Sequence, residues 1–113
     1  MSNPNAISNF ELMVLLALIR LGDEAYGVPI SLEIEKHSGH DTALGSVYAA
    51  LERLQGRGFV SSTVGEPTPE RGGRAKKFYR VTAQGKKALQ ETHRAVQRLS
   101  IGLEGRLTTC LSL

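Results

Sequence analysis

The segment from Asn9 to Leu21 limits the possible folds of this chain more than any other, because it is apolar almost all round a helix. Ser8 followed by Glu11 fits a capping box, so a helix is expected to begin at Asn9. A helix with no polar side must be buried on several sides. In a chain of 113 residues, a second copy is its natural cover. The large apolar positions are Phe10, Leu12, Met13, Val14, Leu15, Leu16, Leu18, Ile19 and Leu21.

Two more helices are expected in the first half of the chain. The second runs from residue 26 or 27 to a break at residues 37–41, and the third covers residues 43–55 with Asp41 or Thr42 as its cap. Apolar residues at spacings of three and four predict a buried stripe on the third helix. That stripe consists of Leu44, Val47, Leu51 and Leu54.

A hairpin and a long helix follow. Residues 59–64 and 77–81 have strand composition, and the intervening segment 65–76 contains too many Pro and Gly residues to be a tight turn. Thr82 can cap the last helix. Its apolar residues form a narrow seven-residue seam, which is typical of a helix that binds a partner. The seam consists of Leu89, Val96 and Leu103, with Thr92 and Leu99 at the alternate positions.

This order predicts a mostly α fold with a β-hairpin wing (α+β), that is, a winged helix-turn-helix followed by a carboxy-terminal dimerisation helix. We expect a flexible segment at 1–7, the winged-helix domain at 8–81, and the dimerisation helix and tail at 82–113. In such a fold, one helix can enter the major groove of DNA while the hairpin reaches the backbone or the minor groove.

Positive charge is concentrated late in the chain. Residues 74–113 carry nine Lys or Arg and two Asp or Glu, whereas residues 1–58 carry four and seven. This asymmetry indicates a polyanionic partner such as nucleic acid. A basic helix that only faces water is the alternative interpretation.

Several other classes of protein are disfavoured. The single cysteine, Cys110, forms no internal disulfide and fits a reducing cytosol, so we expect a cytoplasmic protein. The apolar run at 12–21 is about half as long as a membrane span, so no membrane partner is expected. His37, His40 and Asp41 could bind a metal, but such groupings are common by chance. Because no phosphate loop, nucleophile elbow or zinc pair is present, we expect no enzyme activity, no cofactor and no metal.

The sequence resembles the PadR-like transcription regulators in three stretches, which occur in the order typical of that family and together span about residues 9–89. They are ELMVLLALIRLGDEAYGVPI (11–30), GSVYAALERLQGRGFV (45–60) and GGRAKKFYRVTAQGKKAL (72–89). The resemblance implies a transcription regulator, most simply a repressor, that binds an inverted-repeat operator in double-stranded DNA.

The resemblance also implies a homodimer, in which the last helix of one subunit packs against the first helix of the other. We expect its interface at Phe10, Met13, Leu16, Leu89, Val96, Leu99 and Leu103. A small-molecule effector stays open as a further partner. Some relatives hold a flat aromatic ligand between Trp residues at the dimer centre, which a chain without Trp cannot do.

On the third helix, four exposed positions are candidates for reading base edges. Arg53 can make a bidentate contact to guanine, although a solvated Arg is the plain alternative. Ser46 can bond a base or a phosphate, the Ala49 methyl can touch a thymine methyl, and Gly45 lets the backbone approach. Thr42 lies at the start of this helix. The resemblance favours a phosphate contact for the Tyr48 hydroxyl, with a packing role as the alternative.

The hairpin tip carries the second set of candidates. Arg can enter a narrow minor groove, and Lys is suited to phosphate. The set comprises Arg71, Gly73, Arg74, Lys76 and Lys77, with Gly72 helping to keep the tip thin. Fold alone does not fix function, so a winged-helix module that binds an acidic protein is the second hypothesis.

Overall fold

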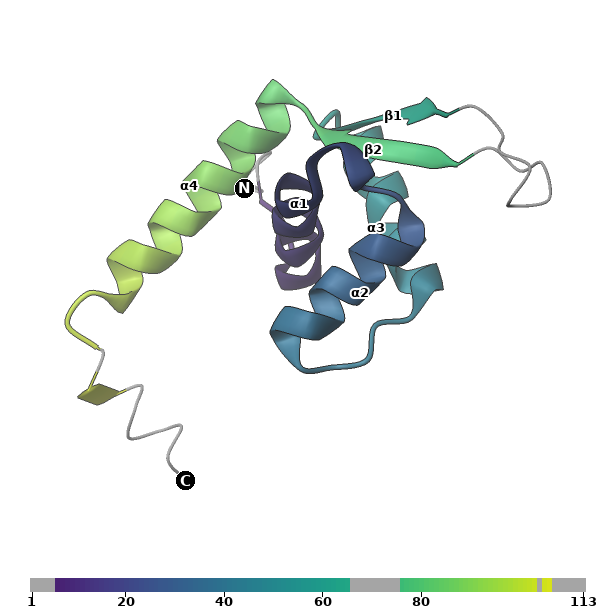
Figure 1. The fold of residues 1–113 in the computed structure, drawn as a ribbon. Coiled ribbons are helices and arrows are strands. Elements are labelled where there is room, and N and C mark those ends of the chain that lie inside the picture. The colour runs from purple at the N-terminus through teal and green to yellow at the C-terminus, as the bar shows by residue number, and fades with distance from the viewer. Residues whose placement is uncertain (1–5, 66–75, 104, 107–113) are drawn as a thin grey trace.

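The computed structural model describes residues 6–65, 76–103 and 105–106. It contains a bundle of three helices, a two-stranded antiparallel hairpin and a long last helix (Figure 1). The predicted winged-helix class is therefore confirmed. The elements are α1 (Asn9–Leu21), a short 3₁₀ turn η1 (Gly22–Glu24), α2 (Gly27–Ser38), α3 (Leu44–Gly56), β1 (Val60–Val64), β2 (Lys77–Val81) and α4 (Ala83–Ser100).

Two helices begin where their capping residues predict. The Ser8 Oγ accepts from the Glu11 N–H at 3.1 Å, and the Glu11 Oε1 accepts from the Ser8 N–H at 2.8 Å, which completes the predicted capping box of α1. The Thr82 Oγ1 accepts from the Gly85 N–H at 3.1 Å and so caps α4.

The start of α3 differs from the prediction. Ala43 occupies the capping position, with no hydrogen bond from a side chain, so the expected cap by Asp41 or Thr42 is wrong. The reason is that α2 already binds Thr42. Its N–H donates to the Glu35 Oε1 and its carbonyl oxygen accepts from the Ser31 Oγ, both at 2.8 Å. Its hydroxyl donates to the carbonyl oxygen two residues earlier.

Three residues of the predicted stripe of α3 are buried as expected, but the fourth, Leu44, is not. Leu44 is 39% exposed because it stands at the first residue of the helix, beyond the edge of the core. Ala50, which lies outside the predicted stripe, is buried as well. The buried residues of α3 are Val47, Ala50, Leu51 and Leu54.

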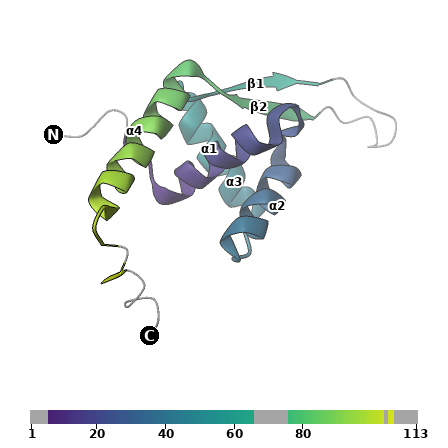
Figure 2. The ribbon, with the colours of Figure 1, turned by 60° about the vertical axis from the view of Figure 1, so that its left-hand side comes forward.

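The core lies where α1, α2 and α3 meet, and the hairpin is attached at its edge (Figure 2). Val14, Leu15 and Ile30 are fully buried there. The Tyr79 N–H donates to the Ala25 carbonyl oxygen at 2.8 Å, which fastens β2 to the turn between α1 and α2. The strands pair from Val60↔Val81 to Val64↔Lys77, so the hairpin leaves the body in a fixed direction.

The last helix extends away from this body (Figures 1 and 2). Only its first two turns are buried, at Gly85, Ala88 and Leu89. Val96 and Leu99 are exposed, so the far part of α4 presents two exposed apolar side chains in the single chain. Among the described residues, no helix is both long enough and apolar enough to cross a membrane.

Candidate nucleic-acid interface

The outer side of α3 is an accessible surface of small side chains. Gly45, Ser46 and Ala49 are all exposed, and nothing lies within 4 Å of where a Cβ on Gly45 would stand. Thr42 is half-buried in the turn before the helix. The structure therefore brings three of the four residues predicted to read base edges, Gly45, Ser46 and Ala49, onto one open face.

Tyr48 points from α3 to the start of α2. A Cβ on Gly27 would overlap the Tyr48 hydroxyl, so this tyrosine can lie here only because residue 27 is glycine. The backbone N–H groups at the start of a helix carry partial positive charge. Tyr48, which is 43% exposed, thus places its hydroxyl beside a region that favours anions. No local pattern in the sequence around Gly27 indicates this role.

The base of the wing packs against the same start of α2. The Lys76 Nζ lies 4.3 Å from the centroid of the Tyr26 ring. The Tyr26 ring meets the Phe78 ring edge to face, with the centroids 5.5 Å apart. The Lys77 Nζ lies 5.7 Å from the centroid of the Tyr79 ring. Both lysines are therefore positioned by aromatic side chains, and Tyr26 joins the candidate site as a residue that sequence reasoning missed.

Tyr79 itself is a support for this surface. Burial, together with the nearby Tyr48 and Glu52, raises the pKa of the Tyr79 hydroxyl, so it stays neutral at physiological pH. The predicted contacts at the hairpin tip lie outside the described residues. They are Arg71, Gly72, Gly73 and Arg74.

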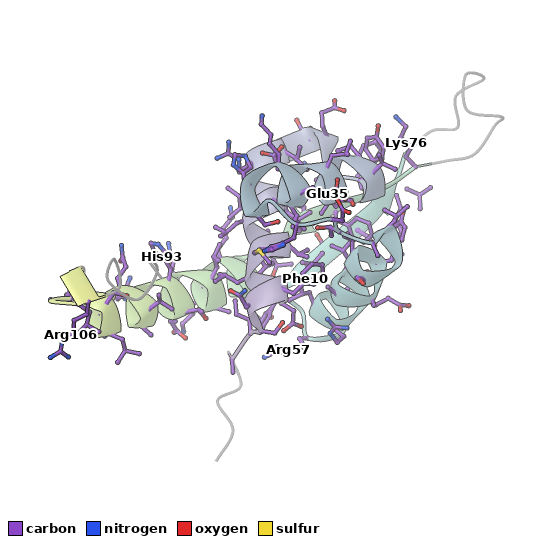
Figure 3. The ribbon with its side chains drawn as sticks, turned by 90° about the horizontal axis from the view of Figure 1, so that it is seen from below. Phe10, Glu35, Arg57, Lys76, His93 and Arg106 are labelled. Carbon is purple, nitrogen blue, oxygen red and sulfur yellow. The ribbon has the colours of Figure 1, made fainter. Side chains whose placement is uncertain are left out.

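A buried carboxylate lies at the other end of α3. The Glu11 Oε2 is 3.5 Å from the Arg53 Nε, and the Glu11 Oε1 is 4.0 Å from the Arg57 Nη1. Burial raises the pKa of Glu11, but the Ser8 hydrogen bonds and the two guanidinium groups outweigh it and hold the pKa below its usual value. Figure 3 shows Arg57 near the beginning of α1, where Phe10 is labelled. Sequence reasoning found the cap made by Glu11 but not these ion pairs.

The predicted dimer residues fall into three groups. Leu16, Val96 and Leu99 are exposed, whereas Phe10, Met13 and Leu103 are half-buried. Leu89 packs into the core of its own chain. A groove of about 420 Å³ runs between α1 and α2, and its lining includes Met13, Leu16, Ala17, Ile19, Ile34 and His37. His37 bonds Glu33 at 2.9 Å, and in the described part of the chain no three potential metal ligands gather.

Proteins similar to this chain in sequence and fold include several transcriptional regulators. The model of the transcriptional regulator PadR-like family matches residues 15–91. A transcriptional regulator from Mycobacterium tuberculosis is 32% identical over 78 residues, which cover 69% of this chain and 68% of that protein.

Solved structures agree with this match. A transcriptional regulator from Clostridium thermocellum superimposes with a TM-score of 0.66 at 26% identity, over 80% of this chain and 84% of its own. A PadR family regulator from Clostridium difficile shares the fold with a TM-score of 0.72 at 20% identity, over 88% and 99% of the two chains. This chain belongs to the PadR-like family of transcriptional regulators.

Proposed function

We propose that this chain binds double-stranded DNA sequence-specifically as a homodimer and represses transcription from an inverted-repeat operator. One observation carries the proposal. The start of α2 lies between α3 and the wing, because the Tyr48 side chain packs on Gly27 and the Lys76 ammonium lies over the Tyr26 ring. A helix, a positively polarised helix start and a basic strand therefore converge on one surface.

The two parts of that surface suit different parts of a duplex. Small side chains on α3, at Gly45, Ser46 and Ala49, allow the helix to approach base edges in the major groove. Lys76 and Lys77 lie where the wing leaves the body, and there they can neutralise phosphates. Phosphate contacts would fix the register of the protein, and α3 would read the sequence.

The dimer rests on the exposed apolar residues of α1 and α4. We propose that α4 of one copy covers the α1 face of the other, with Leu16 on one side and Val96 and Leu99 on the other. Such a dimer would present two α3 helices, so the operator half-sites should be about 10 bp apart from centre to centre.

Titration of labelled promoter fragments at two salt concentrations tests the proposal. If the dimer makes about 6–10 phosphate contacts, its affinity should fall by roughly 10³–10⁵ between 50 and 200 mM salt. Competition with unlabelled random duplex measures the sequence preference. Binding that polyglutamate displaces as readily as DNA, or the absence of binding to every fragment, would instead favour an acidic protein partner.

A further inference from the structure

Arg53 is the only basic residue of α3, and a carboxylate from α1 lies beside it. Its side chain is 55% exposed, and its Nε is 3.5 Å from the Glu11 Oε2. Its neighbours on this face of α3, Ser46 and Ala49, are small, so the arginine is the group there best able to discriminate one base pair from another.

Glu11 is held in place independently of Arg53. Glu11 is only 6% exposed, and its Oε1 accepts a hydrogen bond from the Ser8 N–H at 2.8 Å. The start of α1 thus fixes the carboxylate before any DNA is bound. The same Oε1 lies 4.0 Å from the Arg57 Nη1, and the Arg57 guanidinium in turn lies 4.7 Å from the centre of the Phe59 ring.

A fixed carboxylate limits the directions in which an arginine can point. The guanidinium group is a rigid planar fork, so when Nε faces Glu11 the edge formed by Nη1 and Nη2 must face away from it. We infer that Glu11 is a positioning residue that aims this edge of Arg53 at a guanine in the operator. This inference rests on the proposed DNA binding, and it assigns the control of base preference to a residue outside α3.

Preorganisation is the physical gain. A free arginine side chain has many rotamers and loses that freedom when it binds a base. An arginine already oriented by a partner loses less, and it also discriminates more strongly, because a misplaced fork cannot make both hydrogen bonds to guanine. Glu11 would therefore act on specificity more than on phosphate affinity.

Glu11→Gln separates this role from helix capping. The amide oxygen of glutamine can still accept the Ser8 N–H, as capping boxes with Gln do, but the charge facing Arg53 is gone. A random-pool selection with the wild type defines the operator. The affinity for each of the four base pairs at each operator position is then measured for the wild type, Glu11→Gln, Arg53→Ala and the double variant.

At the operator position read by Arg53, Glu11→Gln should reduce the preference for guanine over the other bases about tenfold. This is within the range of discrimination that one bidentate arginine contact provides. Preferences at other positions and affinity for random duplex should not fall. Arg53→Ala should remove the same preference, and adding Glu11→Gln to it should change nothing more. Asp23→Asn is the matched control, because it breaks an exposed Arg–carboxylate pair with Arg80 outside α3, and it should keep the wild-type preference.

Circular dichroism checks that each variant is folded. Glu11→Asp provides a second test: it draws the carboxylate back by one methylene, so its effect on base preference should be intermediate. Unchanged discrimination in folded Glu11→Gln and Glu11→Asp would overturn the inference and leave the proposed function intact. The inference would also be overturned, with the proposed function intact, if Glu11→Gln changed base preference as much in the Arg53→Ala variant as in the wild type. A wild type without any sequence preference would overturn both.

Discussion

Glu11 is the residue whose ionisation the fold uses most directly, and it makes stability depend on pH. Its pKa in the folded chain lies below the ordinary value of 4.5. A depressed pKa means that the carboxylate stabilises the fold above pH 4.5, and that this contribution is lost as the pH falls through the folded value.

Glu11→Gln should therefore lower the free energy of unfolding by about 1 kcal/mol at pH 7, since both guanidinium partners are partly exposed. The difference from the wild type should shrink below pH 4.5. Urea unfolding monitored by circular dichroism at pH 7, 5 and 3 measures it. Asp23→Asn should leave the unfolding curve unchanged, because its pair with Arg80 is almost fully exposed. A constant difference at all three pH values would refute the ionic account.

Gly45 allows stability and binding to be separated at a single residue. Open space surrounds a Cβ built on it, so Gly45→Ala should raise the free energy of unfolding by about 0.5–1 kcal/mol through helix propensity. If the helix backbone packs on base edges, the same methyl should cost about 1–3 kcal/mol of DNA binding by overpacking. Thermal melts and operator titrations test the two effects. Gly56→Ala, also in open space but at the far end of α3, should change stability alone.

Contacts between residues far apart in the chain explain what the sequence could not predict at this scale. The capping role of Glu11 is local and was found from Ser8, three residues away. Its pairs with Arg53 and Arg57 depend on how α1 crosses α3. The need for glycine at residue 27 depends likewise on the direction of Tyr48. Neither the ion pairs of Glu11 nor the contact between Tyr48 and Gly27 leaves a periodic signal in the sequence.

At the scale of elements, boundaries were predictable where a helix carries its own cap. Ser8 and Thr82 mark α1 and α4 correctly. The prediction failed at α3, because Ser31 and Glu35 of α2 bind the backbone of Thr42. The strand residues 77–81 were predicted correctly from composition and match β2. Local chemistry thus predicts an element's ends unless a neighbouring element uses the same groups.

The wing and the start of α2 should act together in binding phosphate. Lys76→Gln removes the ammonium group that lies over Tyr26. Since a dimer carries two copies, the slope of log affinity against log salt should become shallower by roughly 1.8. Affinity should fall alike for operator and random duplex. Salt titrations measure the slope, and Lys36→Gln, near the opposite end of α2, should not alter it. A loss confined to the operator would mean that Lys76 reads bases.

At the scale of the whole molecule, the far part of α4 leaves apolar side chains exposed at Val96 and Leu99. Leu99 is 78% exposed although it lies on the predicted seam. Exposed apolar residues on such a seam add stability only when another surface covers them. The sequence predicted the seam from its spacing. It could not predict that Leu89 would be used by the core of its own chain, because the seven-residue repeat does not distinguish internal from external partners.

Leu99→Glu tests the dimer and its consequence for DNA together. A carboxylate placed in an apolar interface loses water without gaining a partner, so the dimer should dissociate. The mass from light scattering should then fall to the 12.3 kDa of one chain. Because the two α3 helices would no longer be linked, affinity for a full operator should drop by about 10²–10⁴, while affinity for an isolated half-site should stay the same.

The control is Leu32→Glu, which changes an exposed leucine on α2 outside the groove, and this variant should stay dimeric. A wild type that is itself monomeric at micromolar concentration would contradict the dimer, and equal losses on full and half operators would contradict the linkage.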